Sequence, residues 1–467
     1  MTAGERAANR PLDLWIAEQV EAVAIAIAMA LVLKFFVIEA YQIPTGSMQP
    51  TILGDAETGI KDRVLADKLC TMIRDPRRWE VMIFRFPNDE RRLYVKRILG
   101  LPGEHLEVMG GDIWVDGAIA RKPDKVNDSV LKAVYPAEGG GMDIGRAFTA
   151  GPGVTVTGRS ATFAPDTDSE LRLRHTVRAE YLHGYDPDWG FDKNRNSHRS
   201  GPEAVSDLEL SATVELADGA EELLITLMSD EGDLVFRLTP SGGDDEVDAK
   251  VTFIDRAGDS RVLAEHRPAD GGRLDTDEAV EIVARDIDRQ IVLWVDGDEW
   301  LRVADDLSGA RVERPTRALA SLAIRGGGEV EDLVVSRDIF YEPKISLPAW
   351  DIPEDSYFAM GDNTQGSLDS RNWETMTYTL EDGRVITGFF FPKPPVGPAP
   401  PDHNPRTAPD GGITFADLHG DEYTFSRSEI VDQTKGFAPF IHRRYLLGKA
   451  VAVFWPIYNP FRWKLIR

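Results

Sequence analysis

The stretch Tyr41-Gln42-Ile43-Pro44-Thr45-Gly46-Ser47-Met48-Gln49-Pro50-Thr51-Ile52 follows directly on an apolar N-terminal segment. Two prolines restrict φ on either side of Ser47, and Gly46 allows a tight backbone just before it. A rigid, exposed serine at the end of an apolar segment is a candidate nucleophile. A simple turn that leaves a membrane helix would give the same pattern, so this stretch alone does not decide between the two interpretations.

A nucleophilic serine needs a base. None of the eight histidines lies in a triad-like motif, and there is neither a Gly-x-Ser-x-Gly elbow nor a Ser-x-x-Lys pattern. Lys96 is the other option, because it alternates with apolar Val95 and Ile98 in a strand-like run. Burial would lower the pKa of this lysine and make it a base, although a lysine in a strand more often lies on a solvated face.

A third polar stretch covers residues 360–371, Met-Gly-Asp-Asn-Thr-Gln-Gly-Ser-Leu-Asp-Ser-Arg. Its Gly-Asp-Asn is typical of a turn. Asp369 and Arg371 lie two residues apart and can form an ion pair, and Ser367 could orient a lysine amine by hydrogen bonding. These groups would complete a site with Ser47 and Lys96.

Together the three stretches resemble the serine, lysine and Gly-Asp-Asn boxes of the bacterial type I signal peptidase (leader peptidase) family. The similar residues are 43–51, 94–97 with 100–104, and 361–371, and two further similarities follow the family's order at 62–68 and 447–456. The chain departs from the family at Thr45, where many members have serine, and at Thr364 and Gln365, where an Arg-Asp is often seen.

The resemblance implies a serine endopeptidase with a Ser–Lys dyad that removes signal peptides from exported preproteins after small residues, in an A-x-A pattern. It implies Ser47 as nucleophile and Lys96 as neutral base, with the Thr45 hydroxyl as oxyanion donor and Ser367 as the group that orients Lys96. Four residues would hold the site together: Asp362, Asn363, Asp369 and Arg371. Five would line shallow substrate pockets: Tyr41, Ile43, Pro44, Tyr94 and Val95.

Two other functions fit parts of this pattern. A self-cleaving repressor-type protease uses similar chemistry but would need a DNA-binding domain and no membrane anchor. A non-enzymatic, membrane-anchored surface protein would bind a glycan or protein partner through its inserted domain. A net charge of −25 argues against a nucleic-acid partner. No metal spacing and no phosphate loop is present, so no cofactor is expected, and the single Cys70 excludes an intramolecular disulfide.

The N-terminus predicts a single-pass anchor in the cell (inner) membrane. Residues 20–40 are long and apolar enough to span a bilayer, with Lys34 near one end, where it can reach the interface. Arg6 and Arg10 favour a cytoplasmic segment 1–19. The catalytic domain would then lie on the extracytoplasmic side, in contact with the lipid bilayer.

The strand pattern predicts a mainly β chain built on a signal-peptidase-type catalytic fold. Its catalytic parts are 41–124, 339–374 and 441–467, with strands expected at 63–66, 80–86, 93–99, 105–109 and 112–115. Residues 375–440 would form a small β insertion with a Pro-rich loop at 391–409 and strands at 377–380, 385–391, 413–416 and 422–425.

Residues 125–338 are too long for a loop and carry a strand pattern of their own, at 208–216, 223–228, 234–238, 250–254, 279–284, 290–295, 320–324 and 330–335. This predicts an inserted β-sandwich, and residues 291–297 resemble a concanavalin/laminin-G-type jelly roll. Its acidic residues suggest a solvated surface or, at Asp244, Asp245, Glu246 and Asp248, a calcium site. We expect a self-contained accessory domain that modulates substrate access or binds a cell-envelope partner, and whose removal leaves the cleavage of a short substrate largely intact.

Overall fold

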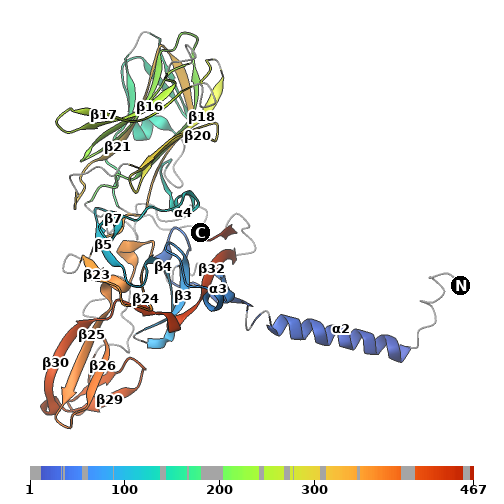
Figure 1. Cartoon of the computed structure of the whole chain (residues 1–467), viewed down its shortest axis with the longest axis vertical. Coiled ribbons are helices and arrows are strands. Elements are labelled where there is room, and N and C mark those ends of the chain that lie inside the picture. Colours follow the sequence, from blue (N-terminus) through green and yellow to red (C-terminus); the bar gives the residue numbers. More distant parts are fainter. Residues whose placement is uncertain are drawn as a thin grey trace.

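The computed structural model describes residues 12–467 except 33, 35–36, 55–60, 88, 137–142, 166–167, 180–202, 241–246, 268–273, 277, 305–311, 344–347, 391–404 and 456–462. The chain is mainly β, as the sequence predicted. Figure 1 shows the β-sandwich at one end, the small β insertion at the other, and the catalytic part between them. Four helices are described beside these strands: α2 (Leu12–Val32), α3 (Leu69–Ile73), α4 (Asp124–Val130) and α5 (Ile144–Ala147).

The central sheet of the catalytic part combines three distant segments of the chain. Its strand order is β1-β2-β32-β3-β4-β24-β31, with β33 paired to β32. The bounds are β1 (Ile38–Gln42), β2 (Arg63–Asp67), β3 (Val81–Phe86), β4 (Asp89–Gly100), β24 (Ser356–Met360), β31 (Ile441–His442), β32 (Leu446–Trp455) and β33 (Lys464–Leu465). A smaller sheet, β23-β5-β6-β7, packs beside it: β5 (His105–Met109), β6 (Asp112–Val115), β7 (Ala118–Ile119) and β23 (Ala349–Asp351). The strands expected in residues 60–120 are therefore confirmed.

The insertion folds as two facing sheets, because its strands alternate apolar and polar side chains. Along β13, for example, Leu208, Leu210 and Val214 are buried and their neighbours are not. One sheet contains β8 (Lys132–Tyr135), β10 (Val154–Thr157), β11 (Ser160–Phe163), β13 (Leu208–Leu216), β18 (Ala279–Ile287), β19 (Gln290–Val295), β20 (Asp298–Ala304) and β22 (Gly328–Arg337). The other contains β9 (Phe148–Ala150), β12 (Glu170–Leu173), β14 (Glu222–Ser229), β15 (Gly232–Leu238), β16 (Ala249–Asp255), β17 (Ser260–His266) and β21 (Ala318–Arg325).

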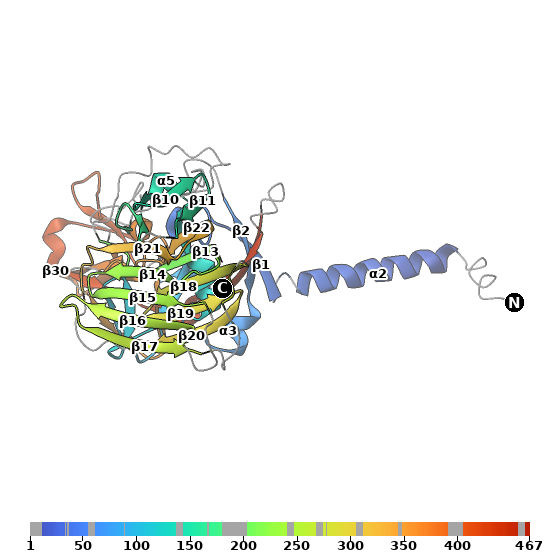
Figure 2. The same cartoon turned by 90° about the horizontal axis from the view of Figure 1, so that it is seen from above.

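We call this pair of sheets the inserted module. Figure 2 shows its strands β14 to β17 lying side by side. One continuous hydrophobic core fills the space between the sheets, with members from Tyr135 to Phe340. All eight strands that the sequence predicted here are present. The prediction missed β17 and β20, as well as the short strands before residue 208.

The small β insertion has two three-stranded sheets, β26-β25-β30 and β27-β28-β29. Their bounds are β25 (Glu374–Leu380), β26 (Val385–Phe390), β27 (Arg406–Thr407), β28 (Ile413–Ala416), β29 (Glu422–Phe425) and β30 (Ile430–Phe437). The two sheets share a separate core around Tyr378 and Phe415. Most of the predicted Pro-rich loop, at 391–404, lies outside the described residues.

Helix α2 extends away from the rest of the molecule (Figures 1 and 2). In the part of the chain that the structure describes, we find no helix with the length and apolarity of a membrane span. The predicted anchor at 20–40 was also too long at its end, because residues 38–40 belong to β1 and pair with residues 65–67 of β2.

Candidate active site

Ser47 and Lys96 meet in the interior of the catalytic part. Ser47 lies on a short 3₁₀ helix, η2 (Gly46–Met48), which follows β1, and Lys96 lies on β4. The Ser47 Oγ and Lys96 Nζ atoms are 2.7 Å apart, which is a hydrogen-bonding distance. Ser47 is 7% exposed and Lys96 only 3%. The serine is therefore buried, whereas the sequence suggested an exposed one, because the end of the chain and the Gly-Asp-Asn stretch pack over its loop.

The environment of Lys96 favours the neutral amine. From Val95 onward every residue of β4 is buried, so the lysine does not lie on a solvated face. Burial lowers the pKa of Lys96 to about 8, although the carboxylates of Asp369 and Asp362 act in the opposite direction. Roughly a tenth of this amine is therefore unprotonated at neutral pH, far more than for an ordinary lysine, and this neutral form can accept a proton from the serine hydroxyl.

A second buried pair lies directly beside the first. Arg97 donates two hydrogen bonds to Asp362, from Nε to Oδ1 and from Nη2 to Oδ2, both at 2.8 Å. Thr51 donates to the same carboxylate, and Arg97 Nη1 donates to the Trp79 carbonyl at 2.7 Å. The sequence prediction gave no role to Arg97, Thr51 or Trp79, although the first two lie inside the quoted motifs.

The Gly-Asp-Asn stretch holds the Ser47 loop by its backbone. The Asn363 amide donates to the Ser47 carbonyl at 3.2 Å, and Asn363 Nδ2 donates to the Gly46 carbonyl at 3.1 Å. Gly361 approaches so closely that a Cβ there would lie 2.2 Å from the Ser47 carbonyl oxygen. A larger residue would push the two segments apart, which explains glycine at this position.

Asp369 and Arg371 form the ion pair that the sequence predicted. Arg371 Nε donates to Asp369 Oδ1 at 2.8 Å, and the carboxylate also accepts from the Gly361 amide at 3.2 Å. Arg371 donates further to the carbonyls of Glu342 and Thr364. The pair therefore fixes the loop that contacts Ser47.

The other predicted residues lie around this centre, but not all of them make the predicted contacts. Ser367 is 3% exposed, but its Oγ has no hydrogen-bond partner among the described residues, so the predicted bond to Lys96 is not formed. Thr45 and Pro44 are exposed beside Ser47. Ile43 and Val95 pack in one core cluster that Tyr41 borders, and Tyr94 stacks on Phe86 with ring centroids 4.6 Å apart.

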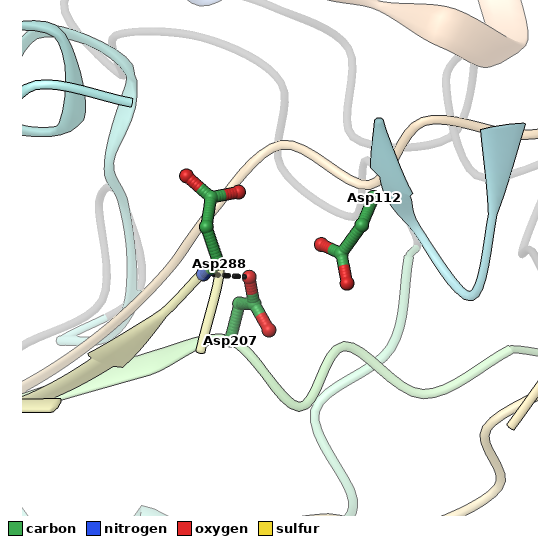
Figure 3. Close-up of side chains that lie close together, drawn as sticks. All are labelled: Asp112, Asp207 and Asp288. Atoms are coloured by element: carbon green, nitrogen blue, oxygen red, sulfur yellow. Dashed lines mark hydrogen bonds between the residues drawn. The ribbon is translucent and has the colours of Figure 1, made fainter. Parts of the chain in front are cut away.

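Acidic residues also gather between the catalytic part and the inserted module. Asp112 of β6, Asp207 and Asp288 have carboxylate oxygens within 4.8 Å of one another, an arrangement that could hold a metal ion, and the Asp288 amide donates to Asp207 at 2.8 Å (Figure 3). Lys122 pairs with Asp288 at 2.5 Å and with Asp338 at 2.7 Å. These three aspartates are not the predicted calcium cluster at residues 244–248. Residues 244–246 of that cluster lie outside the described residues.

A family model described as "Signal peptidase, peptidase S26" matches residues 16–137 and 328–390. The chain is homologous to signal peptidases. Signal peptidase I of Pseudomonas aeruginosa is 43% identical over 117 residues, covering 22% of this chain and 41% of that protein. The probable signal peptidase I-2 of Synechocystis sp. is 34% identical over 113 residues, covering 23% and 48%. The chain thus spans about half the length of these signal peptidases or less.

Both matched stretches of the signal peptidase homology lie outside residues 138–327. They include every predicted site residue, from Tyr41 to Arg371. Among solved structures, a carbohydrate binding module from Bacillus subtilis is similar over 40% of this chain and 93% of its own, with 10% identity and a TM-score of 0.27. Chicken galectin 2 is similar over 28% of this chain and 92% of its own, with 15% identity and a TM-score of 0.21.

Proposed function

We propose that the chain is a membrane-anchored serine endopeptidase that removes signal peptides from exported preproteins, cleaving after small residues. The observation that carries this proposal is the buried contact of 2.7 Å between Ser47 Oγ and Lys96 Nζ. Burial lowers the pKa of Lys96 to about 8, so the amine can serve as the base that a serine nucleophile requires. The homology with signal peptidases supports the substrate class.

In the proposed reaction, Lys96 removes the proton from Ser47 Oγ as that oxygen attacks the scissile carbonyl. The Ser47 amide and the Thr45 hydroxyl would donate to the oxyanion of the tetrahedral intermediate. The C–N bond then breaks, the Lys96 ammonium returns its proton to the leaving amine, and an acyl-enzyme remains on Ser47. Lys96 next takes a proton from a water molecule, which attacks the ester. The ester C–O bond breaks, the Lys96 ammonium returns the proton to Ser47 Oγ, and the signal peptide leaves with a free carboxyl group.

The surrounding residues act by holding these groups. Asn363 bonds to the backbone of Gly46 and Ser47, and Arg371 with Asp369 fixes the same loop. Ser367 would orient the Lys96 amine after a change of its side-chain rotamer. Its buried and unpartnered Oγ supports this role, because such a group gains a hydrogen bond by turning toward the amine.

We also propose that α2 anchors the chain, with the catalytic part on the extracytoplasmic side of the membrane. The apolar side chains along the helix support this, because Val20, Val23 and Ile27 are each more than half exposed and pack against no core. Exposed apolar surface of this kind is usually covered by a membrane or a partner. The exposed Thr45 and Pro44, with Tyr41 and Tyr94 nearby, would border the path of an extended signal peptide.

The test is cleavage of a preprotein with an A-x-A site by purified variants. Ser47→Ala and Lys96→Met should each abolish turnover, since one removes the nucleophile and the other the base. Lys435→Met is the matched control, because Lys435 is exposed on β30 of the small β insertion. Near-normal turnover by Lys96→Met would eliminate the proposed base. A folded wild-type protein that cleaves no preprotein would favour a membrane-anchored surface protein that binds a glycan or protein partner.

A further inference from the structure

We propose that the inserted module positions the catalytic serine, with Gln365 and Thr364 as the positioning residues. Both lie on the short 3₁₀ helix η5 (Thr364–Gly366), immediately after Asn363. The inference rests on the proposed function, because it takes Ser47 as the nucleophile. It replaces the expectation that the module is an accessory that can be removed without loss of cleavage.

The first step of the argument is that η5 and the Ser47 loop share one side chain. Asn363 caps η5, since its Oδ1 accepts a hydrogen bond from the Gly366 amide at 3.2 Å. The same side chain donates from Nδ2 to the Gly46 carbonyl at 3.1 Å, and the Asn363 amide donates to the Ser47 carbonyl. A displacement of η5 therefore moves the backbone that carries the nucleophile.

The second step is that η5 is bonded to the module on its other side. Gln365 Nε2 donates to the Ala179 carbonyl at 3.2 Å, and Thr364 Oγ1 donates to the Phe340 carbonyl at 2.8 Å. Ala179 and Phe340 both belong to the hydrophobic core of the module. Both acceptors lie outside the strands, but both residues pack in the hydrophobic core of the module, which restrains the position of their carbonyls.

The third step is that buried and half-buried ion pairs cross the junction between the two parts. Lys122, in the catalytic part, is 3% exposed and pairs with Asp288 of the module. Arg285 of β18 and Arg302 of β20 bind Asp128 and Asp124 of α4. Removing residues 125–338 would take away both carboxylates that pair with Lys122, Asp288 and Asp338, and breaking such a buried pair is costly. The module is therefore fixed in place and can act as a support.

The chemistry of the two side chains fits this role. Thr364 and Gln365 are the positions at which the third motif departs from the signal peptidase pattern, where an Arg-Asp is often seen. In this chain the two carry neutral donors: Thr364 donates to the carbonyl of Phe340, whose side chain packs in the module core, and Gln365 donates to the carbonyl of Ala179. Ala179 lies outside the residues that the family model matches, so the departure at Gln365 coincides with a contact to a part of the chain that the family lacks.

Gln365→Glu and Thr364→Val test the inference, because each keeps the shape of the side chain and removes its donor. We expect Gln365→Glu to lower kcat about tenfold with KM within twofold, since a misplaced nucleophile slows chemistry and leaves the substrate pockets intact. Thr364→Val should also lower kcat with little change in KM, but the decrease in kcat should be smaller. The pH midpoint of the rate should not move, because Lys96 is untouched. Gln433→Glu, exposed on β30, is the matched control and should match wild type.

Hydrogen exchange gives a readout that does not need activity. In both variants, amides of residues 42–53 should exchange faster, while those of β14 and β21 in the module core keep wild-type protection. Unchanged kcat and unchanged exchange at 42–53 in both variants would overturn the inference. If the wild-type protein cleaves no preprotein but exchange at 42–53 still rises in the variants, the proposed function fails and the structural coupling stands.

Discussion

Arg97 and Asp362 form a doubly hydrogen-bonded ion pair with both side chains closed to solvent. Lys96 precedes the arginine and Asn363 follows the aspartate, so the pair ties the strand of the proposed base to the segment that holds Ser47. Neither partner reacts in the proposed mechanism. Their contribution is to fix the 2.7 Å contact between Ser47 Oγ and Lys96 Nζ.

Breaking this pair should destabilise the fold strongly. Asp362→Asn keeps the size of the side chain but leaves Arg97 as an uncompensated buried charge, which typically costs about 3–5 kcal/mol. The free energy of unfolding in urea measures the loss. Asp382→Asn serves as the control, because Asp382 pairs with Arg384 at the exposed surface, where such pairs contribute little to stability. Similar losses in the two variants would mean that the buried pair has no special role.

Peptidase activity should rise with pH through one limb with a midpoint near 8. The folded protein lowers the pKa of Lys96 to about 8 by burying it, and only the neutral amine can accept the serine proton. Activity is therefore low while the amine is protonated and approaches a plateau once it is neutral. Single-turnover rates between pH 6 and 10 measure the midpoint. A rate that stays constant across this range would show that Lys96 does not titrate in the reaction.

The Thr45 hydroxyl should contribute to catalysis and not to binding. Thr45 is exposed beside Ser47, and Thr45→Val keeps its shape while removing the hydroxyl. Loss of one oxyanion donor typically reduces kcat by about 10²–10³-fold. KM for a preprotein should change much less, and Thr434→Val on β30 should behave like wild type. If kcat is unchanged in Thr45→Val, the oxyanion is stabilised by other groups.

Neutralising Asp112 should stabilise the protein at neutral pH. Burial, together with the negative charge of Asp288, raises the pKa of Asp112 well above its usual value. Folding therefore favours the protonated carboxyl, and this group reduces stability as the pH rises above its unfolded pKa. Asp112→Asn mimics the protonated form. A gain in the free energy of unfolding is expected, because the amide carries no charge that folding must bury beside Asp288.

The gain from Asp112→Asn should disappear as the pH falls toward 4, where the wild-type carboxyl is protonated in both states. Thermal midpoints between pH 4 and 8 measure it, with the exposed Asp218→Asn as control. Loss of stability in Asp112→Asn, together with stabilisation of the wild type by Ca²⁺, would contradict this account. It would show that Asp112, Asp207 and Asp288 hold a cation.

Sequence reasoning located the strands whose side chains alternate and missed those whose side chains do not. β13 alternates along its whole length and was predicted with its observed bounds. β17 lies at the edge of its sheet and exposes residues on both faces, so no apolar period marks it. The strand pattern thus identified a sandwich, but it could not show how many strands complete it.

The contacts of the candidate site likewise fall into those that the sequence could predict and those that it could not. The contacts between Ser47 and Lys96 and between Asp369 and Arg371 could be predicted, because these residues lie in the motifs that resemble the signal peptidase family. The bonds of Gln365 and Thr364 to Ala179 and Phe340 could not, since they depend on how the module docks. The burial of Ser47 also escaped prediction, because it depends on packing by distant segments.

The position of β32 bears on when the central sheet is completed during synthesis of the chain. This strand lies between β2 and β3 and pairs with both, so it joins the half of the sheet next to Ser47 to the half that carries Lys96. Ribosomes make the chain from the N-terminus, and residues 446–455 emerge long after both catalytic residues. A nascent chain therefore lacks the strand that joins these two halves of the sheet until residues 446–455 have been made.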